Sequence, residues 1–179
     1  MKRVSILAML ILILAVGALP AAAITGGQLD GEGHPNVGLM IADIDGEPEW
    51  RCSGTLIAPR VFLTAGHCTY GVTGARVWFD TDLTDNEEYP YGGDTSFEGT
   101  PIPHPDYPWA SDDPRDVGLV ILDDPVEDID PATLPAPDLL AQLKKDGILK
   151  GGYGNSDKDD VFFRPVGYGR SLASWPPAE

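Results

Sequence analysis

The sequence predicts an all-β protein of short antiparallel strands, because of its apolar runs and the residues that separate them. The runs are rich in β-branched, aliphatic and aromatic residues, and Gly, Pro, Asn and Asp punctuate them. Several short strands at this spacing are typical of a closed or sandwich-like antiparallel structure. The expected strands are residues 37–44, 52–58, 61–65, 75–80 and 117–122.

The N-terminus has the pattern of a secretory signal peptide. Residues 1–3 form a short basic start, residues 4–19 are apolar, and Pro20 with three following alanines ends the segment in an Ala-x-Ala cleavage signature. The apolar run is short and has no basic stop-transfer cluster after it, which disfavours the alternative of an uncleaved membrane anchor. We therefore expect residues 1–23 to be removed and the protein to be secreted.

Charge and cysteine content restrict the class of protein further. Without residues 1–23 the chain has 10 basic residues against 28 acidic ones, a net charge of −18. Such a charge argues against nucleic acid or an anionic membrane as a partner. In an exported chain Cys52 and Cys68 are expected to form one disulfide, which closes a loop of about 15 residues. A metal or redox role is disfavoured, because there is no Cys-x-x-Cys and no second His nearby.

The chain beyond residue 80 is less regular. Residues 81–116 are acidic and rich in Pro and Gly, with at most one strand at 96–102, and a loop of that length is usually functional or disordered. Residues 125–137 shift in composition to Pro, Asp and Ala, which indicates a connection between two units. Asp138 is expected to cap a short helix that contains three leucines and ends at Gly147. Residues 161–169 have the pattern of a further strand.

The stretch that points most directly to chemistry is residues 61–68, Val-Phe-Leu-Thr-Ala-Gly-His-Cys. An apolar run leads into a turn at which Gly66 permits a tight bend, and Cys68 can staple that turn so that His67 points one way. A histidine that acts as a general base needs such rigid placement. The octapeptide resembles the histidine motif of the trypsin-like (chymotrypsin-fold) serine endopeptidases.

Five local matches to that family occur in the family's order. Besides residues 61–68, residues 24–27 (Ile-Thr-Gly-Gly) resemble the mature N-terminus, and residues 52–57 (Cys-Ser-Gly-Thr-Leu-Ile) resemble the strand with the partner cysteine. Residues 104–107 (His-Pro-Asp-Tyr) resemble a His-Pro-x-Tyr segment that often precedes the catalytic Asp. Residues 116–122 (Asp-Val-Gly-Leu-Val-Ile-Leu) resemble the Asp-Ile-Ala-Leu-Leu pattern. One such match is weak, whereas five in order are specific.

The resemblance implies catalytic roles for two residues. His67 is expected to be the general base that takes a proton from a serine and returns it to the leaving amine. Asp116 is expected to fix the tautomer of His67 and to stabilise the imidazolium. Asp112 and Asp113 are local rivals, but only Asp116 directly precedes an apolar strand. The resemblance implies a protein or peptide substrate and no cofactor.

Other titratable residues are given no catalytic role. His34 and His104 each precede a proline and are interpreted as loop positions. An acidic cluster follows the strand at 75–80, near where some family members bind calcium, and carboxylates on one flexible loop suit that ion. A solvated acidic face is the favoured alternative, so no metal site is assigned. The cluster comprises Asp80, Asp82, Asp85, Glu87 and Glu88.

One part of the family's pattern is missing from the sequence. The nucleophile of these enzymes lies in a Gly-Asp-Ser-Gly-Gly segment of the second barrel, and no such segment occurs here. Ser156, Ser171 and Ser174 are interpreted as loop or strand-end serines. The resemblance thus implies a chymotrypsin-like, six-stranded antiparallel barrel over residues 24–124, a linker with a short helix over 125–147, and the start of a truncated second barrel over 148–179.

The sequence is therefore interpreted as a secreted trypsin-like serine endopeptidase that is truncated before its nucleophile and is inactive as it stands. The alternative is a non-catalytic half-protease that acts as an extracellular binding or regulatory module. Such a module has no use for His67, Asp116 and the activating type of N-terminus together. Signal peptidase, cutting after Ala23, would itself release Ile24 as the mature N-terminus. The specificity pocket of the family lies in the missing part, so no cleavage specificity is assigned.

Overall fold

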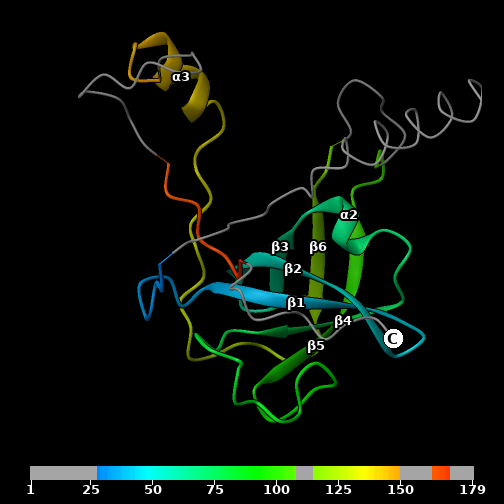
Figure 1. Ribbon diagram of the computed structural model, residues 1–179. Coiled ribbons are helices and arrows are strands. Elements are labelled where there is room, and N and C mark those ends of the chain that lie inside the picture. Colours follow the sequence, from blue (N-terminus) through cyan, green and yellow to red (C-terminus); the bar gives the residue numbers. More distant parts are fainter. Residues whose placement is uncertain (1–27, 108–114, 150–162, 170–179) are drawn as a thin grey trace, which may run out of the picture. The chain divides into compact units, whose positions relative to one another are not determined.

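Six antiparallel strands close into a barrel in the computed structural model, which describes residues 28–107, 115–149 and 163–169 (Figure 1). The order of strands around the barrel is β1-β2-β3-β6-β5-β4. This architecture confirms the predicted fold class. The strands are β1 (Val37–Ile44), β2 (Glu47–Ala58), β3 (Val61–Thr64), β4 (Gly74–Trp78), β5 (Ser96–Pro103) and β6 (Gly118–Leu122).

The strand β2 begins five residues before its predicted start at residue 52, and the hairpin turn explains the difference. Asp45 and Gly46 both have positive φ angles, 54° and 90°, so the chain reverses in two residues and Glu47 pairs directly with Ile44. An Asp-Gly pair is a strong hairpin signal. The polar residues after the turn, with Pro48 among them, do not have the pattern of a strand, so this extension of β2 was not predicted.

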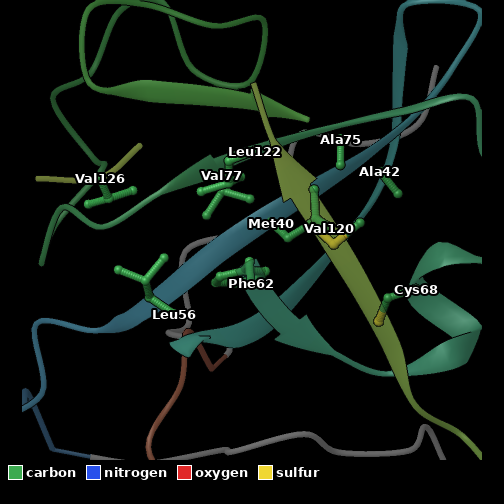
Figure 2. Packing of buried hydrophobic residues seen from close by; sticks show 10 residues of the cluster. All are labelled: Met40, Ala42, Leu56, Phe62, Cys68, Ala75, Val77, Val120, Leu122 and Val126. Atoms are coloured by element: carbon green, nitrogen blue, oxygen red, sulfur yellow. The ribbon is translucent and has the colours of Figure 1, made fainter. Parts of the chain in front are cut away.

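The barrel is filled by side chains from β1, β2, β3, β4 and β6 and from the short helix α2 (Gly66–Thr69) (Figure 2). Phe62 lies at the centre of this core and is fully buried. Gly54 of β2 gives the Phe62 ring its space, because a Cβ atom at residue 54 would lie 2.4 Å from the ring. The core residues are Met40, Ala42, Leu56, Phe62, Cys68, Ala75, Val77, Val120, Leu122 and Val126.

The short helix predicted after Asp138 is present as α3 (Leu139–Lys145). Asp138 occupies the N-cap position, but its φ of 68° is left-handed and its side chain makes no capping hydrogen bond. An N-cap side chain reaches the helix from an extended backbone, which Asp138 lacks. The C-terminal end follows the prediction, since Gly147 has a φ of 72° and its N–H donates to the Lys144 carbonyl. Of the helices in the described ranges, none has the length and apolar character that a membrane span requires.

The strand predicted over residues 161–169 is not formed by the part that the structure describes, residues 163–169. The closed barrel explains this, because each of its strands already has a partner on both sides and leaves no edge for another strand. Tyr168 instead contacts the barrel through its own polar groups. Its N–H donates to Ser53 Oγ (2.8 Å) and its hydroxyl donates to the Asp80 carbonyl (2.5 Å). Burial, reinforced by the Asp80 charge, raises the pKa of Tyr168 to about 12.

Candidate active site

The histidine motif and Asp116 come together because β3 and β6 are neighbours in the barrel. The two strands pair antiparallel with Thr64 opposite Gly118, so the end of β3 meets the beginning of β6. His67 follows Thr64 by three residues, and Asp116 precedes Gly118 by two. Both residues therefore lie at the same end of the barrel, where α2 follows β3 beside the start of β6 (Figure 1).

Two glycines let α2 approach β6 closely. A Cβ atom at Gly118 would lie 2.2 Å from the Thr69 hydroxyl oxygen and 2.8 Å from the Ala65 carbonyl oxygen. A Cβ atom at Gly66 would lie 2.9 Å from the Tyr107 ring and 3.1 Å from the Val117 backbone nitrogen. Contacts under 3.0 Å are not found around real Cβ atoms, so larger residues at 66 or 118 would push α2, and His67 with it, away from Asp116.

The predicted disulfide between Cys52 and Cys68 is confirmed, and it ties the helix of His67 to β2. Cys68 is buried among the core residues, whereas the adjacent His67 is exposed. The fourth residue of the helix is also fixed, because the buried Thr69 hydroxyl donates to the Gly66 carbonyl (3.1 Å). The turn that carries His67 is thus held by a covalent bond on one side and by packing on β6 on the other.

The Asp116 carboxylate binds His67 through both of its oxygens. Oδ2 lies 2.8 Å from the imidazole Nδ1, and Oδ1 accepts the backbone N–H of His67 (2.7 Å). An ionised carboxylate only accepts hydrogen bonds, so Nδ1 carries the proton and Nε2 carries the lone pair. The side chain of His67 is 58% exposed, which leaves the Nε2 edge accessible to a reacting group. The pair therefore has the geometry of a general base and the carboxylate that orients it.

Hydrogen bonding stabilises the charged form of Asp116. Partial desolvation acts to raise the pKa of its carboxyl group, but the hydrogen bonds from the His67 ring, the His67 backbone and the Gly66 backbone together hold that pKa below its ordinary value. The attraction of the His67 charge acts in the same direction. Asp116 is consequently ionised throughout the range of pH in which an imidazole changes its charge.

The other residues considered from the sequence lie elsewhere or outside the described ranges. His34 is bound to Asp30 (2.8 Å), and the Nδ1 of His104 accepts the backbone N–H of Asp106 (3.1 Å). Neither histidine is hydrogen-bonded to His67 or to Asp116. The residues outside the described ranges are Ile24, Asp112, Asp113, Ser156, Ser171 and Ser174.

Metal binding has little support among the described residues. The one group of three potential ligands that lie within 4.8 Å of one another is Cys52, His67 and Cys68, and its sulfurs are bonded to each other. The acidic cluster that begins at Asp80 forms no such group. Its Asp82 instead accepts the backbone N–H (2.9 Å) and the hydroxyl (2.5 Å) of Thr84, within a local turn. The calcium alternative raised by the sequence thus gains no observation in its favour.

A separate shallow cavity of about 320 Å³ lies between β1, β4 and β5. Its central feature is the ion pair of Arg76 and Asp43 (3.1 Å), whose side chains are 12% and 6% exposed. Burial raises the pKa of Asp43 despite the opposing charge of Arg76. The guanidinium is also bound to the carbonyls of Gly46 and Pro90 (3.0 and 3.2 Å). The hydrogen bonds of these groups are made to one another, so we interpret the cavity as structural. The candidate site is therefore the pair of His67 and Asp116 at the end of the barrel.

Sequence reasoning missed one residue beside the site. Arg115 has a φ of 41°, a left-handed conformation that is unusual for a residue of its size. Its guanidinium is paired with the carboxylate of Asp106 (2.6 Å). No residue pattern marks this turn, because the left-handed angle of Arg115 is set by the fold around it. The pairing partner was not predictable without the fold.

A closed six-stranded antiparallel barrel, with His67 and Asp116 hydrogen-bonded to each other at one end, is the architecture of the chymotrypsin-like fold. The family model described as Trypsin matches residues 32–166, and the chain therefore belongs to the trypsin family. The comparison with curated proteins finds no match.

Two solved structures are similar to this chain, and the first of them shows the same fold. A structure titled as HL collagenase is 24% identical with a TM-score of 0.52, and the match covers 66% of this chain and 50% of that one. A structure titled as GrC is 23% identical with a TM-score of 0.43, and the match covers 64% of this chain and 47% of that one. This chain thus spans about half the length of the solved structures it matches.

Proposed function

We propose that this chain supplies the first barrel of a secreted serine endopeptidase, with His67 as general base and Asp116 as its orienting carboxylate. The observation that carries the proposal is the bonded pair itself, Nδ1 to Oδ2 at 2.8 Å, with the other edge of an exposed imidazole left for a reacting group. Membership of the trypsin family supports the reaction class, hydrolysis of peptide bonds in proteins or peptides.

The proposed mechanism divides the work between the two residues. The Nε2 atom of His67 takes the proton of a serine hydroxyl as the serine attacks the substrate carbonyl, and then delivers it to the leaving amine. The Asp116 carboxylate keeps the imidazole in the required tautomer and stabilises the positive charge that forms on it. No cofactor enters this cycle. The serine and the donors that stabilise the tetrahedral oxyanion belong, in this proposal, to a second barrel.

The domain boundaries follow from the same proposal. Residues 24–124 form the first barrel after signal removal, residues 125–147 the linker, and residues 148–179 the beginning of the second barrel. Ile24 is proposed as the mature N-terminus. The 179 residues contain no Gly-Asp-Ser-Gly-Gly segment, so we expect them to hydrolyse no peptide or ester by themselves.

The test is to extend the chain. The coding sequence beyond Glu179 is read for a Gly-Asp-Ser-Gly-Gly segment, and the extended protein is assayed on casein and with a serine-directed organophosphate. We expect labelling of that serine, lost in His67→Ala and retained in the control His34→Ala, whose imidazole binds only Asp30 among the described residues. Labelling of the 179-residue chain itself, or labelling that survives His67→Ala, would contradict the proposal. A chain that binds proteins tightly without labelling would favour the alternative of a binding module.

A further inference from the structure

The turn that carries Asp116 is held in an uncommon backbone conformation. Arg115 has a φ of 41°, and the Val117 N–H donates to the Arg115 carbonyl (2.6 Å), so that Asp116 is the middle residue of a three-residue turn. The other two non-glycine residues with positive φ in the described ranges are aspartates, which adopt this region more readily than arginine does. A residue held in such a conformation is fixed by its surroundings.

Those surroundings come from the His-Pro-Asp-Tyr segment at the end of β5. The Asp106 carboxylate pairs with the Arg115 guanidinium (2.6 Å) on one side of Asp116. On the other side, the His104 N–H donates to the Val117 carbonyl (2.9 Å). The segment is itself braced, because the Asp106 N–H donates to Nδ1 of His104 (3.1 Å). Both neighbours of Asp116 are therefore held by residues that lie within three positions of each other in the sequence.

We propose that Asp106 and Arg115 are positioning residues that aim the Asp116 carboxylate at His67. The pair does not touch the imidazole. It holds the residue before Asp116 in the left-handed conformation, and this conformation turns the next side chain toward α2. This inference deepens the proposed function, and its relevance to catalysis rests on that function. The contacts themselves are all made between residues of this chain.

The competing explanation is an ordinary surface ion pair. Both side chains are about half exposed, and exposed pairs contribute little to stability. A pair that serves only stability would influence Asp116 through its charges, and the direction of that influence is fixed. Replacing Asp106 by Asn removes a negative charge and leaves the Arg115 charge without its partner, so charge alone lowers the pKa of Asp116. Loss of positioning acts in the opposite direction, because weaker hydrogen bonds from His67 let the pKa of Asp116 rise.

The experiment measures the Asp116 carboxyl by carbon-13 NMR titration in the 179-residue chain carrying Asp106→Asn. We expect the pKa of Asp116 to rise toward the ordinary value of an aspartate. The downfield proton resonance of the His67 Nδ1–H group should weaken or disappear in the same variant. Asp106→Glu, which keeps a carboxylate, should restore most of both signals. The matched control is Asp124→Asn, which removes an exposed carboxylate beyond the opposite end of β6 and should change neither.

A second variant keeps the test decisive if Asp106→Asn does not fold. Asp106→Ala makes the same change of charge with a different side chain, so charge alone again lowers the pKa of Asp116 and a rise reports a change of geometry. An Asp116 pKa that falls or stays constant in either variant overturns the inference. Neither measurement needs hydrolysis. An extended protein without activity would refute the proposed function and leave these results standing, and the reverse holds equally.

Discussion

Removal of the disulfide should destabilise the barrel strongly, because Cys52 and Cys68 link two elements that frame His67. Their sequence separation is 16, and a cross-link that closes a loop of about this size lowers the entropy of the unfolded chain by an amount worth about 3 kcal/mol. In Cys52→Ala/Cys68→Ala the buried Cys68 also loses its sulfur from the core. We add about 1 kcal/mol for that loss, by analogy with the removal of a buried methyl group.

The expected loss of unfolding free energy in the double variant is therefore about 4 kcal/mol. Urea unfolding followed by tryptophan fluorescence measures it, since Trp78 is fully buried and changes its environment on unfolding. The control is wild-type protein whose disulfide is reduced and whose thiols are left unmodified. It separates the contribution of the cross-link from that of the buried sulfur. It keeps both sulfurs and loses the cross-link alone, so its expected loss is about 3 kcal/mol. A loss below about 1 kcal/mol in the double variant would refute the reasoning, because the loop closure would then contribute almost nothing.

Three further predictions follow from the site and its supports. Gly118→Ala should cost about 1–3 kcal/mol of unfolding free energy and weaken the downfield Nδ1–H signal of His67, because the new methyl group displaces α2; a fully stable variant with an intact signal would contradict this. Asp116→Asn should remove stability at neutral pH but little at low pH. The pKa of Asp116 is lowered in the folded state, so its contribution is present above the unfolded pKa and is lost as the pH falls through the folded value; equal urea midpoint differences at pH 7 and pH 3 would contradict it. Tyr168→Phe should cost about 0.5–1.5 kcal/mol through loss of the hydrogen bond to Asp80. The pKa of Tyr168 is raised to about 12, so the stability that this variant lacks should be present below pH 10 and disappear as the pH rises toward 12, as measured by urea unfolding in alkali.

The strands of the barrel were predictable because their patterns are local. β1 has the predicted bounds, and β5 differs from its prediction by one residue. The start of β2 was not found, because a two-residue turn at Asp45 and Gly46 extends the ladder into a polar stretch. The strand expected over residues 161–169 was wrong in its described part, because a strand needs a partner and each strand of the closed barrel already pairs on both sides.

The sequence indicated His67 and Asp116 of the candidate site, but it did not indicate the residues that support Asp116. The residues around His67 form a specific local motif, and Asp116 was preferred to its neighbours because only it directly precedes an apolar strand. The support of Asp116 was not predictable, since the pairing of Arg115 with Asp106 depends on a backbone angle that no residue pattern specifies. The local sequence around a polar residue on an exposed turn is the same whether its side chain holds a neighbouring residue in place or only contacts solvent.

The register of β3 against β6 decides whether the two residues of the site meet at all. Thr64 lies opposite Gly118, and this pairing joins parts of the chain that are separated by 54 positions, for which the residues supply no local signal. If β3 slipped by one residue, Phe62, which is fully buried opposite Val120, would turn toward the other face of the sheet. The core therefore specifies the register of β3 against β6, and this register brings His67 and Asp116 to the same end of the barrel. Side chains with no chemical role in hydrolysis thus determine the 2.8 Å contact on which the proposed catalysis depends.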